Sequence, residues 1–174
     1  GLSVIHRPVK TIPGVKTLFR GSLDLDIVRV ATGGTYADPG RLVGRDAAVA
    51  LRIVEAEPSR EAARFAFDLA RRLGKKVTSS SKYTIQRFTD GLFERVVDDI
   101  DALYSDVSLE RELFDALLAK VVMRPESFGV VLVLNEYGDF LSDMACGLIG
   151  SLGLGASGNY SYEGDGLNVA LFDA

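Results

Sequence analysis

The amino-acid sequence predicts a layered α/β protein, and three features of the 174-residue chain support this prediction. Short apolar runs rich in β-branched residues alternate with longer segments whose apolar residues recur at helical spacing. Hydrophobic residues make up 47% of the chain and charged residues 25%, which is typical of a globular protein with a substantial core. The length suits one ordinary domain, or one and a fraction.

The first third of the chain is expected to form strands joined by glycine-rich connections. Residues 1–20 indicate a short strand followed by a connection that Pro and Gly interrupt. Residues 23–32, LDLDIVRVAT, are typical of a strand, and they lead into a loop at 33–45 that contains four glycines. Residues 48–57 are apolar and β-branched enough to predict another strand.

A well-marked helix is predicted next, opened by Pro58 and Ser59 and closed by Gly74. Ser59 is expected to cap the helix. Glu61 is favourable in the first turn because its negative charge interacts with the positive end of the helix dipole. The side chains expected to face inward recur at helical spacing, and they are Ala62, Phe65, Ala66, Leu69, Ala70 and Leu73.

The second half of the chain continues the alternation of strands and helices. We expect a strand over 75–82, helices over 90–104 and 108–123, a strand over 128–134, an apolar helix that begins at or near Asp139, and a strand over 168–174. The 108–123 helix should stop before Pro125. The apolar side chains expected to face inward include Leu103, Leu109, Leu113, Leu117, Val121 and Val122.

Charge, cysteine content and hydropathy exclude several classes of protein. Lys and Arg number 20 against 24 Asp and Glu, so the net charge of −4 argues against nucleic-acid binding. With one Cys and one His, a thiolate or imidazole metal site is nearly excluded, and Cys146 is interpreted as a buried structural thiol in a reducing compartment. No apolar run reaches the roughly 18 residues of a membrane helix. We expect a cytoplasmic protein, with an organelle matrix as the alternative.

The segment NEYGDFLSD places two carboxylates, Asp139 and Asp143, four residues apart between two apolar segments. On a helix both would share one face, which is a suitable half-site for Mg²⁺ or Mn²⁺. The alternative is that Asp139 caps the helix and Asp143 is a solvated helix residue. Spacing alone favours this alternative slightly, whereas the apolar surroundings weaken it, because uncompensated carboxylates are unfavourable among buried residues.

Two further side chains could take part in chemistry. Asp115 lies at the edge of the apolar face of the 108–123 helix, where it could instead pair with Arg111, one turn earlier. Lys82 ends the 75–82 strand, and a partly desolvated lysine can donate or accept protons because burial lowers its pKa. Most lysines at strand ends are simply solvated.

Two arginines and a tyrosine complete the set of candidates. Arg7 and Arg29 lie in apolar, strand-like segments, and a buried arginine requires a carboxylate partner, which can belong to a substrate. Tyr36 lies in the glycine-rich loop, where an exposed phenol often has no role beyond the surface. Composition and spacing thus reach only a candidate acidic metal site in an α/β protein.

Several ordered motifs resemble those of the isocitrate/isopropylmalate dehydrogenase family. RPVKTIPGVKT (7–17), VRVATGGTYAD (28–38) and KYTIQRFTDGLFERV (82–96) are similar to three of its segments in the family's order. The run from PESFGVVLVLNEYGDFLSD to GSLGLGASGN (125–159) resembles its NxxGDxxSD and GSxGxxPSAN region, and ALFDA (170–174) resembles its LFEA segment. The resemblance covers nearly the whole chain, and DGLF and PGVKT are closer to the isocitrate branch.

The resemblance implies an enzyme that oxidises a 2-hydroxy acid, above all isocitrate, with NAD or NADP and then releases CO₂, aided by Mg²⁺ or Mn²⁺. It also implies a homodimer in which the partner subunit supplies the lysine and one aspartate of each site. The family's roles fall on Arg7 and Arg29 as substrate-carboxylate ligands, Tyr36 and Lys82 as proton-handling catalytic residues, and Asp115, Asp139 and Asp143 as metal ligands. It assigns no cofactor-binding residue.

The resemblance further implies two parts in the chain. Residues 1–125 correspond to the family's central substrate and dimerisation domain, and 126–174 to part of its large cofactor domain. We expect the family's N-terminal segment and the loop that binds the adenosine of the cofactor to be missing. The sequence also departs from the family pattern at Val30 and at Tyr83 and Thr84. A non-catalytic regulatory or dimerisation subunit is therefore the alternative function.

Overall fold

A seven-stranded mixed sheet organises the protein, for which a computed structural model describes residues 1–17, 21–150, 155–163 and 166–173. The strands lie in the order β6-β5-β7-β2-β1-β8-β9. Their bounds are β1 Val4–Lys10, β2 Asp24–Val30, β5 Val77–Ser81, β6 Leu109–Leu113, β7 Val130–Val133, β8 Ser157–Glu163 and β9 Gly166–Asp173. Strands β6, β5, β7 and β2 are mutually parallel, whereas β1, β8 and β9 join by antiparallel pairing.

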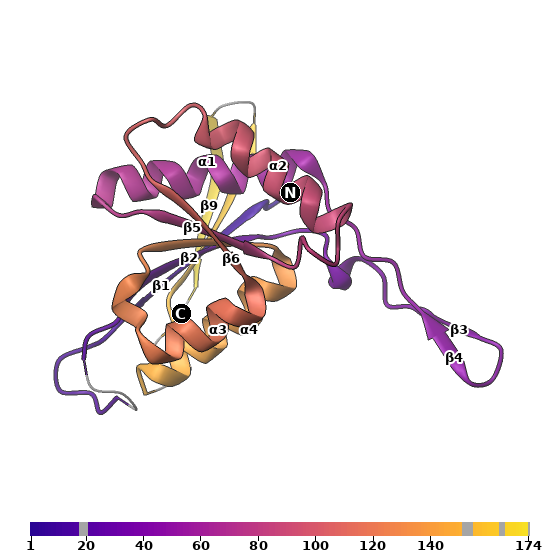
Figure 1. Ribbon diagram of the computed structural model, residues 1–174, viewed down its shortest axis with the longest axis horizontal. Coiled ribbons are helices and arrows are strands. Elements are labelled where there is room, and N and C mark those ends of the chain that lie inside the picture. The colour runs from indigo at the N-terminus through magenta and orange to yellow at the C-terminus, as the bar shows by residue number, and fades with distance from the viewer. Residues whose placement is uncertain (18–20, 151–154, 164–165, 174) are drawn as a thin grey trace.

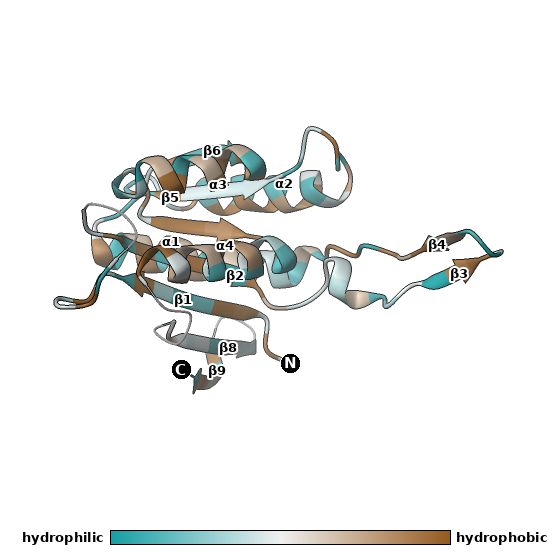
Figure 2. Cartoon of the chain, turned by 90° about the horizontal axis from the view of Figure 1, so that it is seen from below, coloured by the Kyte–Doolittle hydropathy of each residue, from teal (hydrophilic) through white to brown (hydrophobic). Residues whose placement is uncertain are grey.

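Helices of the described residues cover both faces of this sheet (Figure 1). Helices α1 (Ala56–Leu73) and α2 (Thr89–Asp101) pack on one face, and α3 (Phe114–Met123) and α4 (Asn135–Leu148) pack on the other. The strands β2 and β7 are buried almost throughout, and Figure 2 shows both apolar and polar residues on the helices that cover the sheet. The predicted α/β class is therefore confirmed, with one hydrophobic core on each side of the sheet.

A hairpin stands away from this body (Figure 1). It consists of β3 (Arg41–Val43) and β4 (Ala47–Val49), whose residues are all exposed, and it follows a short 3-10 helix, η1 (Thr35–Ala37). The strand predicted over 48–57 is wrong beyond Val49, because α1 already begins at Ala56. The apolar residues of this stretch suggested a sheet strand, but β3 is the one strand paired with β4 in the described part of the chain.

Helix α1 begins earlier than predicted, and Ser59 does not cap it. Ser59 is buried in the first turn, where its hydroxyl donates a hydrogen bond of 2.7 Å to the Glu55 carbonyl. Gly74 ends the helix as predicted, with the positive φ of 63° that glycine adopts without a Cβ clash. Most of the predicted inward face is buried, but Leu73 is 43% exposed and the fully buried Phe67 was missed.

The helix predicted over 108–123 is instead a strand followed by a helix. Leu109 and Leu113 begin and end β6, which pairs in parallel with β5, and α3 starts only at Phe114. Leu117 and Val121 are buried as predicted, whereas Leu103 and Val122 are largely exposed. The short helix η2 (Pro125–Ser127) then leads to β7, as expected from the proline.

Helix α4 begins at Asn135, one residue after Leu134, which follows β7. Asp139 therefore lies in the second turn, and the alternative that it caps the helix is wrong.

Strand β7 lies between β5 and β2, so residues on both sides of position 125 share one sheet. The division of the chain into two domains at that position stays a prediction. None of the helices in the described ranges has the length and apolar character needed to cross a membrane.

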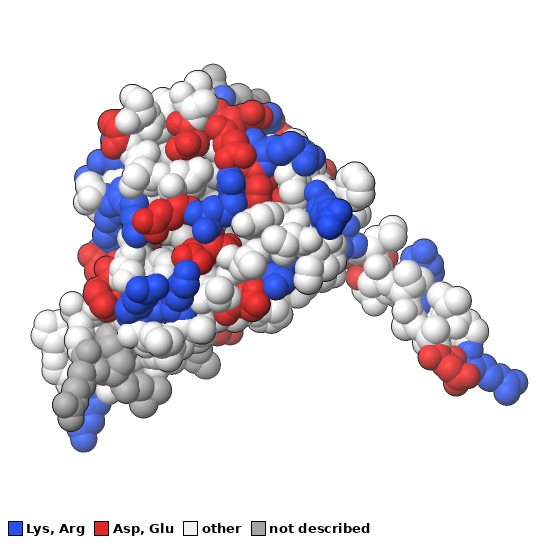
Figure 3. Space-filling model, in the orientation of Figure 1, with Lys and Arg blue, Asp and Glu red and all other residues white. Residues whose placement is uncertain are grey.

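Opposite charges are interleaved over the face shown in Figure 3. Many of the surface charges are paired, as in the Arg71–Asp106 ion pair, whose closest N–O distance is 2.5 Å. Exposed pairs of this kind contribute little to stability. The buried charges near the carboxyl ends of the parallel strands are of more interest.

Candidate active site

The candidate residues gather where the parallel strands end. Arg29 is near the end of β2 and Tyr36 follows in η1, whereas Lys82 directly follows β5 and Asp115 follows β6 by two residues. Helix α4, with Asp139, starts just after β7. Since the carboxyl ends of parallel strands meet at one edge of a sheet, the topology brings residues from five segments to that edge, which is the usual ligand-binding edge of α/β proteins.

One cluster is centred on the Asp139 carboxylate. Arg29 donates a hydrogen bond from Nη1 to Oδ1 of Asp139, and the Tyr36 hydroxyl donates one of 2.9 Å to Oδ2. Arg29 also donates from Nε to the Asn135 side-chain oxygen at 2.8 Å. Burial raises the pKa of Asp139, but the Tyr36 hydrogen bond and the positive charge of Arg29 outweigh it and lower this pKa overall. The carboxylate is therefore ionised at neutral pH.

Arg7 approaches the next turn of α4 from β1. Its Nη1 lies 3.6 Å from Asp143 Oδ1 and donates a hydrogen bond of 3.3 Å to the Ser142 hydroxyl. Its Nε is buried without a hydrogen-bond partner in the described part of the chain. The Arg7 side chain is 28% exposed, so the accessible part of its guanidinium beside α4 is a suitable partner for a substrate carboxylate.

A second cluster pairs Lys82 with Asp115. The Lys82 Nζ lies 2.8 Å from Asp115 Oδ1, and this hydrogen bond lowers the pKa of Asp115. Lys82 is therefore not simply solvated. The alternative that Asp115 pairs with Arg111 is also wrong, because Arg111 contacts Glu94 and Asp98 instead.

The three predicted metal ligands do not meet within one chain. Asp139 and Asp143 share one face of α4, whereas Asp115 is held by Lys82. No group of three or more His, Cys, Asp or Glu side chains that could hold a metal occurs among the described residues. Mg²⁺ commonly takes only one or two protein carboxylates and fills its remaining positions with water and substrate oxygens, so a carboxylate pair on α4 has the right chemistry for such an ion. In this structure each of the two carboxylates is paired with an arginine, Asp139 with Arg29 and Asp143 with Arg7.

Gly138 allows Arg29 to reach its partners, and sequence reasoning missed this role. A Cβ added at Gly138 would lie 2.6 Å from both Cβ and Cγ of Arg29 and 2.8 Å from its Cδ. The stem of Arg29 thus passes directly over the helix backbone at this glycine. The spacing of the NEYGDFLSD segment offered no sign of this contact, since the two residues are 109 positions apart in the sequence.

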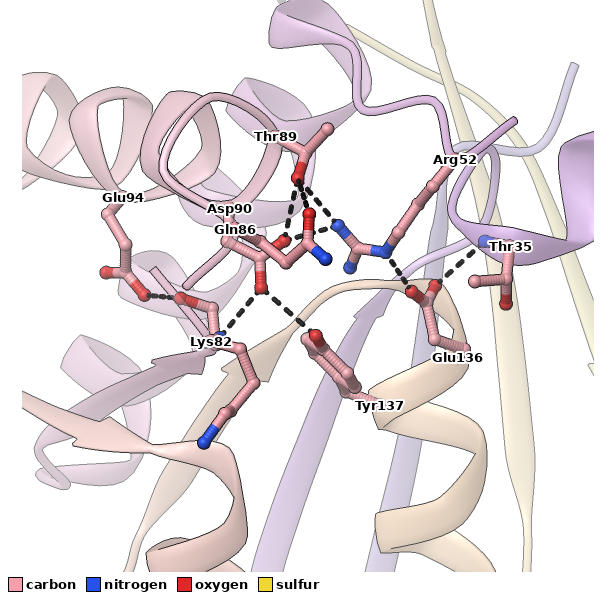
Figure 4. Close-up of polar contacts among 10 residues, drawn as sticks. Thr35, Arg52, Lys82, Gln86, Thr89, Asp90, Glu94, Glu136 and Tyr137 are labelled. Atoms are coloured by element: carbon pink, nitrogen blue, oxygen red, sulfur yellow. Dashed lines mark hydrogen bonds and ion pairs between the residues drawn. The ribbon is translucent and has the colours of Figure 1, made fainter. Parts of the chain in front are cut away.

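A buried ionic network, also missed, lies beside the candidate residues (Figure 4). Arg52 contacts two carboxylates, Asp90 and Glu136, which are 0% and 4% exposed. The signal that could have found Arg52 is the same one that singled out Arg7 and Arg29, an arginine inside an apolar segment. Glycine-rich residues 151–154 of the GSLGLGASGN motif lie outside the described residues.

Comparisons with known proteins place the chain in the family that its motifs resemble. The sequence profile of the isocitrate/isopropylmalate dehydrogenase family matches residues 2–173. A probable mitochondrial NAD isocitrate dehydrogenase subunit alpha of Drosophila melanogaster is 35% identical over 97% of this chain and 43% of its own length. A 3-isopropylmalate dehydrogenase of Archaeoglobus fulgidus is 38% identical over 96% of this chain and 49% of its own length.

The fold comparison gives the same result. The crystal structure of isocitrate dehydrogenase from Methylococcus capsulatus superposes with a TM-score of 0.85 at 34% identity, covering 98% of this chain and 50% of that one. The chain thus spans about half the length of the relatives it matches.

Proposed function

Because the chain belongs to the isocitrate/isopropylmalate dehydrogenase family, we propose that it is part of an NAD- or NADP-dependent enzyme that oxidises and decarboxylates a 2-hydroxy acid. The observation that carries the proposal is the hydrogen-bonded cluster of Arg29, Tyr36 and Asp139, which joins three of the residues to which the family resemblance gives roles. Isocitrate is the favoured substrate, on the DGLF and PGVKT segments.

The two arginines would bind and orient the substrate. Arg29 is mostly buried and already spans a carboxylate and an amide oxygen, so its guanidinium is held in a fixed orientation. Arg7 presents the exposed part of its guanidinium beside the same helix. Together they could bind two carboxylates of a small polycarboxylic acid, each with charge-assisted hydrogen bonds. Fixing the acid in this way holds its hydroxyl-bearing carbon in one place.

Tyr36 and Lys82 would handle protons. Burial and the hydrogen bond to Asp139 raise the pKa of Tyr36, so the phenol is protonated at neutral pH and can donate a proton to carbon after CO₂ departs. The Lys82 amine would receive the proton of the substrate hydroxyl during oxidation. In this chain the Lys82 Nζ donates a hydrogen bond of 2.8 Å to Asp115 Oδ1.

Asp139 and Asp143 would hold a divalent metal from one subunit, with Asp115 completing the site from a second. A bound Mg²⁺ or Mn²⁺ would polarise the carbonyl formed by oxidation, and the nicotinamide of NAD or NADP would accept the hydride. The proposal includes a homodimer with shared sites, because Lys82 and Asp115 form a pair of their own and the family resemblance places both on the partner subunit.

A non-catalytic subunit is the second candidate. The observation in its favour is the departure from the family pattern at Val30 and at Tyr83, next to Lys82. Such a subunit would keep the dimer-forming fold without turnover. It predicts a stable dimer that does not bind NAD or NADP.

The test is turnover by the intact protein, supplied separately with isocitrate and 3-isopropylmalate, with NAD or NADP, and with Mg²⁺ or Mn²⁺. We expect reduction of the cofactor that stops when the metal is chelated.

Tyr36→Phe should lower kcat by about 100-fold, the usual contribution of a positioned acid. Tyr104→Phe is the matched control, because it removes a similar tyrosine–carboxylate hydrogen bond, to Asp68, away from the site. Failure of the wild-type protein with both acids at high enzyme concentration would contradict the proposal and favour the non-catalytic subunit.

A further inference from the structure

We propose that Arg52 is a positioning residue that holds the backbone at both proton-handling residues, Lys82 and Tyr36, by clamping two buried carboxylates. The effect on catalysis rests on the proposed function, whereas the effect on the backbone does not. Arg52 itself lies after the β3–β4 hairpin, outside every motif that pointed to chemistry. Figure 4 shows its guanidinium between Asp90 and Glu136.

The first carboxylate, Asp90, fixes the end of β5. Arg52 donates from Nη1 to Asp90 Oδ1 and, at 3.0 Å, to the Thr89 hydroxyl. The other oxygen, Oδ2, accepts a hydrogen bond of 2.7 Å from the backbone N–H of Lys82 and one of 3.1 Å from the Tyr137 hydroxyl. The Lys82 main chain is therefore held by an acid that is completely buried.

The second carboxylate, Glu136, fixes the turn that carries Tyr36. Arg52 donates from Nε to Glu136 Oε1 at 2.6 Å, and Oε2 accepts a hydrogen bond of 3.4 Å from the backbone N–H of Thr35. Gly34 packs so closely against this carboxylate that a Cβ there would overlap Oε2. Gly34 also exchanges backbone hydrogen bonds of 2.6 and 3.2 Å with Ile53, the neighbour of Arg52.

The clamp requires an arginine. Two different nitrogens of one planar group point at two different acids, and the Tyr137 ring lies 5.3 Å from the guanidinium carbon. A lysine has a single ammonium and reaches one acid well at most. Without Arg52, two buried carboxylates would each lose their cationic partner, and both would shift or admit water. The backbone at Thr35 and the backbone at Lys82 would then become more mobile together, which is the distinctive consequence of the proposal.

The test compares the intact wild-type protein with Arg52→Met, Arg52→Lys and the control Arg71→Met, which removes an arginine–aspartate pair on the surface. Hydrogen exchange is followed at peptides containing Thr35, Lys82 and, as an internal reference, Val131 of the buried strand β7. We expect Arg52→Met to speed exchange at Thr35 and Lys82 together by about tenfold or more, with Val131 unchanged. Arg71→Met should change none of them.

Kinetics give the second readout. Arg52 contacts neither the arginines nor the α4 aspartates, so kcat should fall by about 100-fold, the usual consequence of misplacing catalytic groups by about 1 Å, while KM stays within about threefold. The kcat of Arg52→Lys should lie between those of the wild-type protein and Arg52→Met. Should Arg52→Met fail to fold, Arg52→Lys decides.

Two results would overturn the inference. One is unchanged exchange at both amides in the folded variants, and the other is exchange that rises at one amide only or equally at Val131. If the wild-type protein shows no turnover, the proposed function fails, but the exchange measurement still decides whether Arg52 couples the two segments.

Discussion

At the scale of single residues, the structure buries charges in pairs and triads. Asp26 of β2 is 2% exposed, and its two carboxylate oxygens accept hydrogen bonds from His6 Nε2 at 2.9 Å and Lys75 Nζ at 2.8 Å. Burial raises the pKa of Asp26, but the hydrogen bonds from His6 and Lys75 outweigh it, so the pKa is lowered overall. Asp26 is therefore more acidic in the folded than in the unfolded protein.

This lowered pKa predicts how stability depends on pH. The stabilisation from Asp26 is fully present above its unfolded pKa, and it is lost as pH falls through the lower pKa of the folded protein. Urea titrations at neutral pH and near pH 3 should therefore show a smaller acid-induced loss of unfolding free energy for Asp26→Asn than for wild type, with Asp26→Asn less stable at neutral pH. Asp99→Asn, an exposed acid on α2, is the control. Equal acid sensitivity of Asp26→Asn and wild type would contradict the assignment.

At the scale of elements, the local sequence pattern was compatible with either a helix or a strand at some positions, and strand pairing selected between them. Leu109 and Leu113 are four residues apart, a spacing that suits one face of a helix, and they are also at alternate positions of a strand. The parallel register with β5, from Val77 opposite Leu109 to Ser81 opposite Leu113, selects the strand. Helix α4 shows another effect of tertiary packing. Its close contact with β2 depends on Gly138, although glycine has a low propensity for the interior of a helix.

The packing of α4 on β2 can be tested with two glycines of the same helix. Gly138→Ala would force the Arg29 stem aside, so we expect the unfolding free energy to fall by about 1–3 kcal/mol. Displacement of the guanidinium should also lower kcat/KM by about 10- to 100-fold. Gly147→Ala has no neighbour within 4 Å of the added Cβ and should be neutral or stabilising by up to about 1 kcal/mol. Urea unfolding and steady-state kinetics measure both; equal behaviour of the two variants would refute the close-packing argument.

At the scale of the whole molecule, five of the seven candidate residues form two groups at one sheet edge, and Arg7 and Asp143 form a further pair on α4. Arg29, Tyr36 and Asp139 are joined directly, whereas Lys82 and Asp115 contact each other. In the proposed homodimer, each subunit would give one of these two groups to each site. The proposed homodimer therefore makes a prediction about mixtures of variants.

Subunit mixing should restore activity between two inactive variants, Lys82→Met and Asp139→Asn. Each alone carries its defect in both sites, whereas a hybrid dimer carries both defects in one site and leaves the other intact. An equimolar mixture that exchanges subunits freely should recover about a quarter of wild-type kcat, since half of its dimers are hybrids with one working site. Native mass spectrometry confirms hybrid formation. Hybrids with no more activity than the parents would place both groups in the same site.

The sequence by itself determined the α/β class, the main helices and strands and the candidate residues, because periodicity and motif spacing are local properties of the chain. It also indicated a family, which the comparisons confirm. Only the tertiary structure decided which candidates meet. Arg29 and Asp139 are 110 positions apart, and Arg52 and Glu136 are 84 apart. Such contacts depend on the order of strands in the sheet and on close approaches at glycines, and neither leaves a periodic signal in the sequence.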